Sequence, residues 1–227
     1  MLKSQMTISQ REFIFIIASL MSLVALVTDA MLPALGQMAQ DFQVDGNAIQ
    51  LVVTSVFAGH ALGQLVYGPL SDAYGRRRSI FLGLGIFCVG SVICASADSL
   101  GVMLLGRFLQ GFGASGPRVM VVALVRDCYS GPTMARIMSF AMTLFMAVPI
   151  VAPLLGQGVL LVGPWWWIFG LYLVIAVIMF VWVFTRLDET LQPENRLSLH
   201  PKKLWRTLLQ VLVNPIATGY ALIAGLV

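Results

Sequence analysis

The sequence predicts an all-α integral membrane protein with six transmembrane helices. Of its 227 residues, 59% are hydrophobic and only 11% are charged, whereas soluble domains carry about 25% charged residues. The mean hydropathy is +0.89, and six apolar runs approach or exceed the roughly 20 residues that a helix needs to cross a bilayer. These observations exclude a soluble enzyme, a nucleic-acid-binding domain and a disordered linker.

The six runs are continuous, which favours helices over strands. A barrel strand would alternate polar and apolar residues over about 10 positions, and turn residues such as Tyr74-Gly75 and Ser130-Gly131-Pro132 separate the runs instead. The predicted spans are Phe13–Leu35, Ala48–Leu70, Ser79–Ala97, Leu100–Val125, Met134–Leu161 and Trp165–Leu187.

The spans divide the chain into four parts. Residues 1–12 form an N-terminal tail, and residues 13–187 form the six-helix bundle. The first run is too long for a signal peptide and contains Asp29 and Pro33, so we expect it to be retained. Residues 188–212 are a polar, basic linker with a predicted interfacial helix. Residues 213–227 begin a seventh apolar segment that is too short to cross, which predicts a chain that is cut short there.

The basic residues predict the orientation. Twelve of the fourteen Lys and Arg residues fall in the N-terminal tail or in the segments Asp72–Ser79, Arg126–Arg136 and Arg186–Arg206, and none falls in the first, third or fifth connection between spans. By the positive-inside rule, the N-terminus and the linker therefore face the cytoplasm. The two remaining basic residues, Arg107 and Arg118, lie inside the fourth span.

Ionisable residues inside the spans are candidates for a functional site, because an Asp or Arg at the centre of a membrane helix costs at least about 2.5–3.5 kcal/mol. Asp29 and Arg107 lie at similar depths, ~8–10 Å below the outer boundary at 1.5 Å per residue. We expect them to form a buried ion pair that a proton on Asp29 would break, which would allow proton coupling. The alternatives are a static clamp between two helices, or a different partner for each residue.

Polar and small residues share one face of the fourth span. Arg107, Gln110, Gly111, Ala114 and Arg118 have helical spacing, so this face is predicted to line a wet cavity or a helix interface. Close helix packing would explain the glycines alone. Arg118 is a cavity candidate that could instead extend to the cytoplasmic surface.

Four further residues complete the predicted cavity and its moving parts. His60 could bind substrate, although a bond to a neighbouring helix is the favoured interpretation, and Met142 lies on a Met-aromatic face that suits either a pliant binding wall or plain packing. Pro149 and Pro153 each remove a backbone hydrogen bond, so the fifth span is predicted to bend there.

The connection after the second span is predicted to be a cytoplasmic gate. Gly68 would let helices approach, Gly75 would supply a permissive turn, and Asp72 would face a helix N-terminus or an arginine of the other half. The alternative is that the arginines only determine the membrane topology, but this would give Gly68 and Asp72 no role. The gate residues are Gly68, Asp72, Gly75, Arg76, Arg77 and Arg78.

These segments resemble the Major Facilitator Superfamily. Gly68–Arg78 is similar to its motif G-x-x-x-D-R/K-x-G-R-R/K-R/K, with Ala73 replacing the usual basic residue. Asp29–Pro33 resembles D-x-x-x-P, and Leu104–Gly113 resembles L-x-x-x-R-x-x-Q-G-x-G, both of the drug/proton antiporter group and its Bcr/CflA branch. Pro149–Gly156 is similar to the antiporter motif in proline placement, but has Ala152 where glycine is common.

The resemblance implies the N-terminal half of a twelve-helix fold in which each half contains two three-helix inverted repeats. It also implies proton-coupled multidrug efflux across the bacterial inner membrane, with Asp29 and Arg107 in proton coupling. The expected partners are drug-like molecules, protons, the bilayer and a missing C-terminal half, and nucleic acid is not expected. No P-loop, metal cluster or nucleophile motif is present, so we expect no cofactor, metal or enzymatic activity. A carrier of a physiological solute and an inactive truncated fragment are the alternatives.

Overall fold

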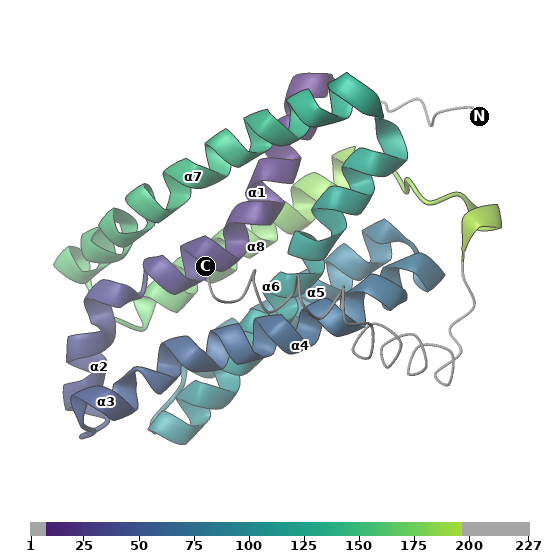
Figure 1. The fold of residues 1–227 in the computed structure, drawn as a ribbon. Coiled ribbons are helices and arrows are strands. Elements are labelled where there is room, and N and C mark those ends of the chain that lie inside the picture. The colour runs from purple at the N-terminus through teal and green to yellow at the C-terminus, as the bar shows by residue number, and fades with distance from the viewer. Residues whose placement is uncertain (1–7, 197–227) are drawn as a thin grey trace, which may run out of the picture.

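A computed structural model describes residues 8–196, and all regular structure within that range is helical (Figure 1). Six helical segments are long and apolar enough to cross a membrane, which confirms the predicted fold class. They are Gln10–Asp41, Gly46–Tyr74, Arg76–Ala95, Leu100–Cys128, Gly131–Val162 and Trp167–Arg186. The predicted interfacial helix around Lys202, Lys203 and Arg206, and the predicted start of a seventh helix, lie outside the described residues.

The first span is interrupted at Asp29. Helix α1 (Gln10–Asp29) begins where the Ser9 side chain accepts a hydrogen bond from the Glu12 amide at 3.2 Å, an N-terminal cap. The chain then passes through a 3-10 turn, η1 (Leu32–Ala34), into α2 (Leu35–Asp41). Pro33 has no N–H with which to continue α1. Asp29 is thus the last residue of a helix, rather than part of the predicted unbroken span.

A single residue, Gly75, separates the second span from the third. Helix α3 (Gly46–Ile49) leads into α4 (Leu51–Tyr74), and α5 (Arg76–Ala95) follows at once. Gly75 has φ +106°, a conformation that glycine adopts without steric cost. The predicted loop Asp72–Ser79 is therefore wrong: residues 72–74 lie in the last turn of α4, and the three arginines 76–78 open α5.

The last three spans are α6 (Leu100–Cys128), α7 (Gly131–Val162) and α8 (Trp167–Arg186), followed by a short turn, η2 (Pro193–Asn195). Helix α7 passes both Pro149 and Pro153 without interruption. Each proline removes one backbone donor, so the predicted bend or weak point stays a prediction. At the end of α8, Arg186 forms a two-point ion pair with Glu12 of α1, at 2.6 and 2.7 Å.

The helices pack in a pattern that has an internal repeat. Helix α6 packs along α5 and α4, α1 packs along α7, and the pairs α1–α6 and α5–α8 are also in contact. If each of the first three spans is exchanged with its counterpart among the last three, the α1–α7 pair becomes the α6–α4 pair, and the α1–α6 and α5–α8 pairs are unchanged. The α5–α6 pair becomes the α1–α8 pair, which packs less extensively. Most of the pattern therefore agrees with two related three-helix units.

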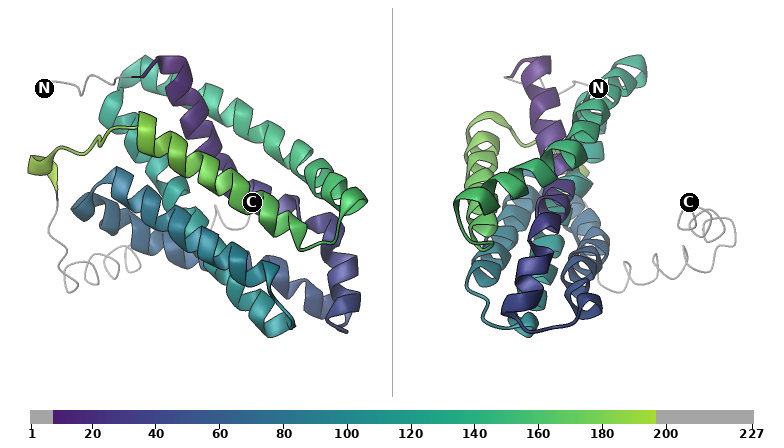
Figure 2. Two further views of the ribbon diagram at one scale, coloured as in Figure 1. Left: turned by 180° about the vertical axis from the view of Figure 1, so that it is seen from behind. Right: turned by 90° about the vertical axis from the view of Figure 1, so that its left-hand side faces the viewer.

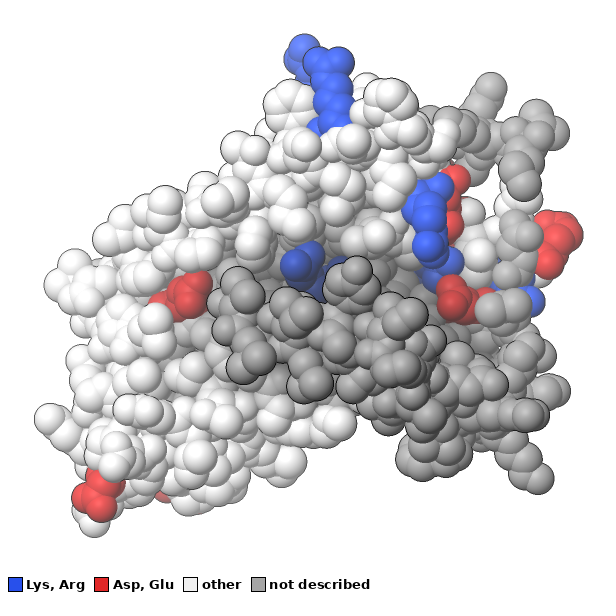
Figure 3. Space-filling model, viewed as in Figure 1, with Lys and Arg blue, Asp and Glu red and all other residues white. Residues whose placement is uncertain are grey.

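One side of the bundle, which we call the central face, is formed by α1 and α6 with α7 and α4 at its edges (Figure 1). Helix α8 lies on the reverse side (Figure 2). Charged side chains are visible toward the end where α4 meets α5 and α6 meets α7 (Figure 3). This end, which we call the basic end, carries Arg76, Arg77, Arg78, Arg126, Arg136 and Arg186.

Candidate functional site

Arg107 of α6 is fully buried, and neutral acceptors satisfy its guanidinium. Nη1 donates to Gln110 Oε1 at 2.9 Å, Nη2 to the Val27 carbonyl of α1 at 3.2 Å, and Nε to the Val52 carbonyl of α4 at 3.3 Å. Gln110 in turn donates to Ser91 Oγ of α5 at 2.8 Å. Arg107 therefore connects its own helix to α1 and α4, and through Gln110 to α5.

The expected ion pair between Asp29 and Arg107 is not formed in residues 8–196. The Val27 carbonyl, two residues before Asp29, receives both the Arg107 guanidinium and the hydroxyl of Tyr172 from α8, the latter at 3.1 Å. Arg107 and Asp29 are thus linked through the backbone of α1. Sequence reasoning missed Tyr172, whose only signal is a hydroxyl in an otherwise apolar span.

Most of the predicted stripe on α6 forms a helix interface. Gln110 and Ala114 are 0% exposed, and a Cβ added at Gly111 would lie 1.9 Å from the Val56 carbonyl of α4. The two backbones are so close that no space remains between them for a ligand. This corrects the expected cavity position of Gln110 and Ala114.

Arg118 lies differently, at the edge of this interface on the central face. Its guanidinium carbon is 5.5 Å from the ring centre of Phe145 on α7, and His60 of α4 lies within its electrostatic range. Arg118 forms no hydrogen bond or ion pair with residues 8–196, and Nδ1 of His60 is buried without a partner there. Arg118 and His60, two predicted cavity residues, thus lie within electrostatic range of one another, and His60 also interacts with the Gly111 backbone of α6.

Met142 is 41% exposed on α7. A groove of about 480 Å³ lies between α1 and α7 at the basic end, with Arg11, Arg136 and Phe140 in its wall. A second groove of about 260 Å³ lies between α1, α7 and α8 and includes Trp182. Neither groove contains Met142, whose place in a substrate cavity stays a prediction.

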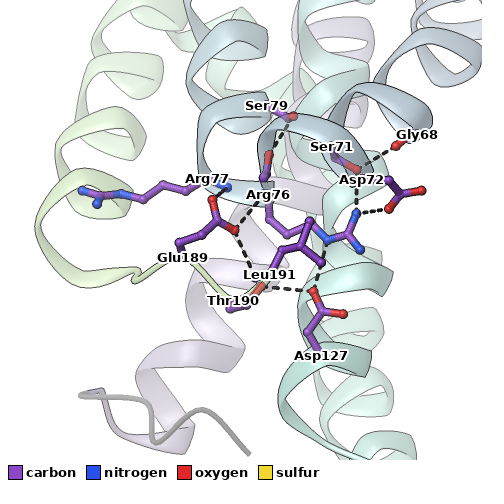
Figure 4. A network of polar contacts seen from close by, with 11 residues as sticks. Gly68, Ser71, Asp72, Arg76, Arg77, Ser79, Asp127, Glu189, Thr190 and Leu191 are labelled. Atoms are coloured by element: carbon purple, nitrogen blue, oxygen red, sulfur yellow. Dashed lines mark hydrogen bonds and ion pairs between the residues drawn. The ribbon is translucent and has the colours of Figure 1, made fainter. Parts of the chain in front are cut away.

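The predicted gate residues form a polar cluster at the basic end, centred on the buried Arg76 (Figure 4). Its guanidinium donates to Asp72 at 2.5 Å, to Ser71 Oγ at 2.7 Å and to Asp127, at the end of α6, at 3.1 Å. Asp72 was expected to face a helix N-terminus or an arginine of another half. Within residues 8–196 its partner is Arg76, the first residue of α5 on the other side of Gly75, and a contact with another half stays a prediction.

The N-terminus of α5 is capped by Glu189, which follows α8 and which sequence reasoning missed. Its carboxylate accepts from the backbone amides of Arg76 at 2.9 Å and Arg77 at 3.2 Å (Figure 4), an arrangement that favours an anion. The next residue, Thr190, donates to Asp127 at 3.2 Å. The segment after α8 thus joins the cluster that links α4, α5 and α6.

The remaining gate residues have different surroundings. Arg77 lies over the rings of Phe81 and Phe184, at 5.3 and 5.2 Å, and donates to the Phe184 carbonyl, whereas Arg78 is exposed. A Cβ added at Gly68 would meet nothing within 4 Å. Within the described part of the chain, Gly68 therefore does not bring two helices together as expected.

No group of three or more His, Cys, Asp or Glu residues between positions 8 and 196 is placed to hold a metal ion. The site thus consists of two parts. One is a polar core around Arg107 beside Asp29, with Arg118 and His60 on the central face, and the other is an ionic cluster around Arg76 at the basic end.

Several known proteins have sequences similar to that of this chain. The chain is 32% identical to the uncharacterized MFS-type transporter YdgK of Bacillus subtilis and 31% identical to the bicyclomycin resistance protein homolog of Haemophilus influenzae; each match covers 94% of this chain and 54% of the relative. It is 33% identical to multidrug resistance protein D of Escherichia coli over 60% of this chain and 34% of that protein. The chain spans about half the length of the first two relatives.

The fold agrees with these matches. The crystal structure of the human organic anion transporter MFSD10 (TETRAN) is similar, with a TM-score of 0.64 and 20% identity, over 93% of this chain and 55% of that one. Its coverage again corresponds to half of a larger transporter, so six spans in this order form an N-terminal half of that fold. Residues 15–227 also match the sequence model of the Major Facilitator Superfamily, and the chain therefore belongs to this family.

Proposed function

We propose that this chain is the N-terminal half of a proton-coupled multidrug efflux carrier, a drug/proton antiporter of the bacterial inner membrane. Relatives named for bicyclomycin and multidrug resistance support the substrate class. The concentration of arginines at the basic end supports a cytoplasmic location for that end and for the N-terminus.

The observation that carries this proposal is the position of Asp29. Among residues 8–196 it is the one acid more than ten residues from both ends of a candidate span, and an ionisable group at such depth is retained for function. Asp29 is half-buried at the end of α1, and the carbonyl two residues before it is bound by Arg107 and Tyr172. Protonation of Asp29 therefore changes the charge at the end of α1, next to the Val27 carbonyl that is hydrogen-bonded to both α6 and α8.

The basic end supplies the gate. The Asp72–Arg76–Asp127 cluster, with Gly75 as its turn, closes the cytoplasmic side in one state, and Gly68, Arg77 and Arg78 belong to the same gate. The carrier then exchanges protons for drug molecules, which cross the membrane in opposite directions. Each ligand shifts the equilibrium between the two states of the carrier only as far as it binds one state better than the other.

The test uses Asp29→Asn in the full-length carrier that contains this chain, reconstituted in liposomes. A pH gradient should drive drug accumulation by the wild-type carrier, and the Asn variant should lose this accumulation while it still exchanges drug down a drug gradient. Asp98→Asn, which changes an exposed acid between α5 and α6, is the matched control and should behave as wild type. Unchanged proton-driven accumulation by the Asp29→Asn variant would exclude Asp29 as the coupling site.

A further inference from the structure

We propose that Arg118 binds a negatively charged group of the transported molecule, so that the substrates of this carrier include amphiphilic anions. The proposal deepens the proposed function, since it names a substrate class for the same transport route. It rests on the surroundings of Arg118 on the central face.

Arg118 has no compensating group in the described structure. The other buried or half-buried arginines between residues 8 and 196 all donate hydrogen bonds: Arg76 to carboxylates, Arg77 to a carbonyl, and Arg107 to two carbonyls and an amide oxygen. Arg118 is also half-buried, yet its one contact of this kind is with the face of the Phe145 ring. It therefore has most of its five N–H donors available to a ligand.

The depth of Arg118 makes an unpaired charge costly. Arg118 lies ten residues before the end of α6 at Cys128, which places it ~15 Å from that end at 1.5 Å per residue. Intramembrane arginines are paired or face a water-filled cavity. A carboxylate, sulfonate or phosphate oxygen that accepts two parallel hydrogen bonds from the guanidinium would remove this cost.

The neighbours of Arg118 favour an anion that also carries an apolar group. Phe145 lies on the α7 side and offers a ring to an apolar or aromatic part of the ligand. His60 lies on the α4 side within electrostatic range of Arg118, and its imidazole brings no negative charge. Among residues 8–196, a cationic ligand at Arg118 would therefore meet two groups capable of positive charge and no ion-pair acid.

The site also has an open side. Helices α4 and α7 both border Arg118, but they are not among the closely packed helix pairs. A ligand that enters between α4 and α7 can therefore reach the guanidinium of Arg118 without separating two packed helices.

The experiment compares two probes of nearly the same shape and opposite charge, tetraphenylborate and tetraphenylphosphonium. Their affinities for the purified full-length carrier are measured by tryptophan fluorescence for wild type, Arg118→Gln, Arg118→Lys and Arg126→Gln. Arg118→Gln should weaken borate binding by about tenfold or more, because it removes the charge attraction between the half-buried guanidinium and the anion, and leave phosphonium binding equal or stronger. Arg118→Lys should retain part of the borate affinity. Arg126→Gln, an exposed position eight residues further along α6, should change neither affinity.

The remaining outcomes separate the two proposals. Borate binding that depends on Arg118 in a carrier without proton-driven export would support this inference and exclude the proposed function. Proton-driven drug export together with equal borate affinity in wild type and Arg118→Gln would exclude the inference alone. Equal losses for both ions, with a lower unfolding temperature of the unliganded variant, would also overturn it, because Arg118 would then bind an acid of the protein itself.

Discussion

The guanidinium of Arg107 donates to the backbone carbonyl of Val27 at 3.2 Å, two residues before the acid that the sequence singles out for proton coupling. A carbonyl acceptor does not change its charge. Arg107 therefore keeps its hold on α1 whether Asp29 is protonated or ionised, and it positions the carboxylate without neutralising it.

Arg107→Lys should destabilise the carrier and impair coupling. A lysine presents its donors from one nitrogen and cannot reach Val27, Val52 and Gln110 together. Each buried acceptor that loses its partner costs about 1–3 kcal/mol, so the unfolding temperature in detergent should fall. Arg126→Lys, at an exposed position of the same helix, should leave the unfolding temperature unchanged. A wild-type unfolding temperature for Arg107→Lys would show that the three acceptors do not depend on it.

Glu189→Gln should loosen the first turn of α5. The amide side chain has one acceptor oxygen and no negative charge, which weakens the cap on the Arg76 and Arg77 amides by about 1 kcal/mol. Hydrogen exchange measured by mass spectrometry should become faster at these amides. Glu194→Gln, in the exposed η2 turn, is the control, and equal exchange in the two variants would argue against the cap.

Gly75→Ala should be far more harmful than Gly68→Ala, although both residues belong to the same motif. At Gly75 the φ of +106° and a Cβ contact of only 2.3 Å with Glu189 Oε2 oppose any side chain, and such backbone strain costs about 1–3 kcal/mol. At Gly68 a methyl group meets nothing within 4 Å. Thermal unfolding of the two variants measures the difference, and equal unfolding temperatures would contradict the structure.

Gly111→Ala should separate α6 from α4. The added methyl group would lie 1.9 Å from the Val56 carbonyl, and overpacking of this kind costs about 1–3 kcal/mol. Gly85→Ala is the matched substitution, because a Cβ there meets nothing within 4 Å. Folded yield after membrane extraction should drop for Gly111→Ala only, and a drop for both would point to a general intolerance of alanine.

The sequence was sufficient for the architecture because membrane spans are a property of composition and length. All six predicted spans match helical segments, and the spacing from Arg107 to Ala114 correctly placed these residues on one face. Periodicity does not identify what a face contacts, however. The polar and small residues of α6 are buried against neighbouring helices, and Gly111 allows close approach of α4. Arg118, at the edge of this interface, faces α7 instead.

The polar partners were beyond sequence reasoning for a different reason. Backbone carbonyls such as those of Val27 and Val52 have no residue signature, so the true acceptors of Arg107 could not be deduced. Glu189 lies 113 positions from the amide that it caps, and no local pattern connects the two. The error in the predicted loop Asp72–Ser79 had a local cause, since Gly75 with positive φ replaces the longer connection that hydropathy suggested.

The contacts of Glu189 and Thr190 have a mechanical consequence. The chain leaves α8 at Arg186 and, within four residues, is hydrogen-bonded to the start of α5 and the end of α6. A displacement of the chain beyond this point would therefore be transmitted to both helices at once. The segment after α8 is therefore mechanically coupled to Arg76 of α5 and Asp127 of α6, and its movement is not taken up by a loose loop.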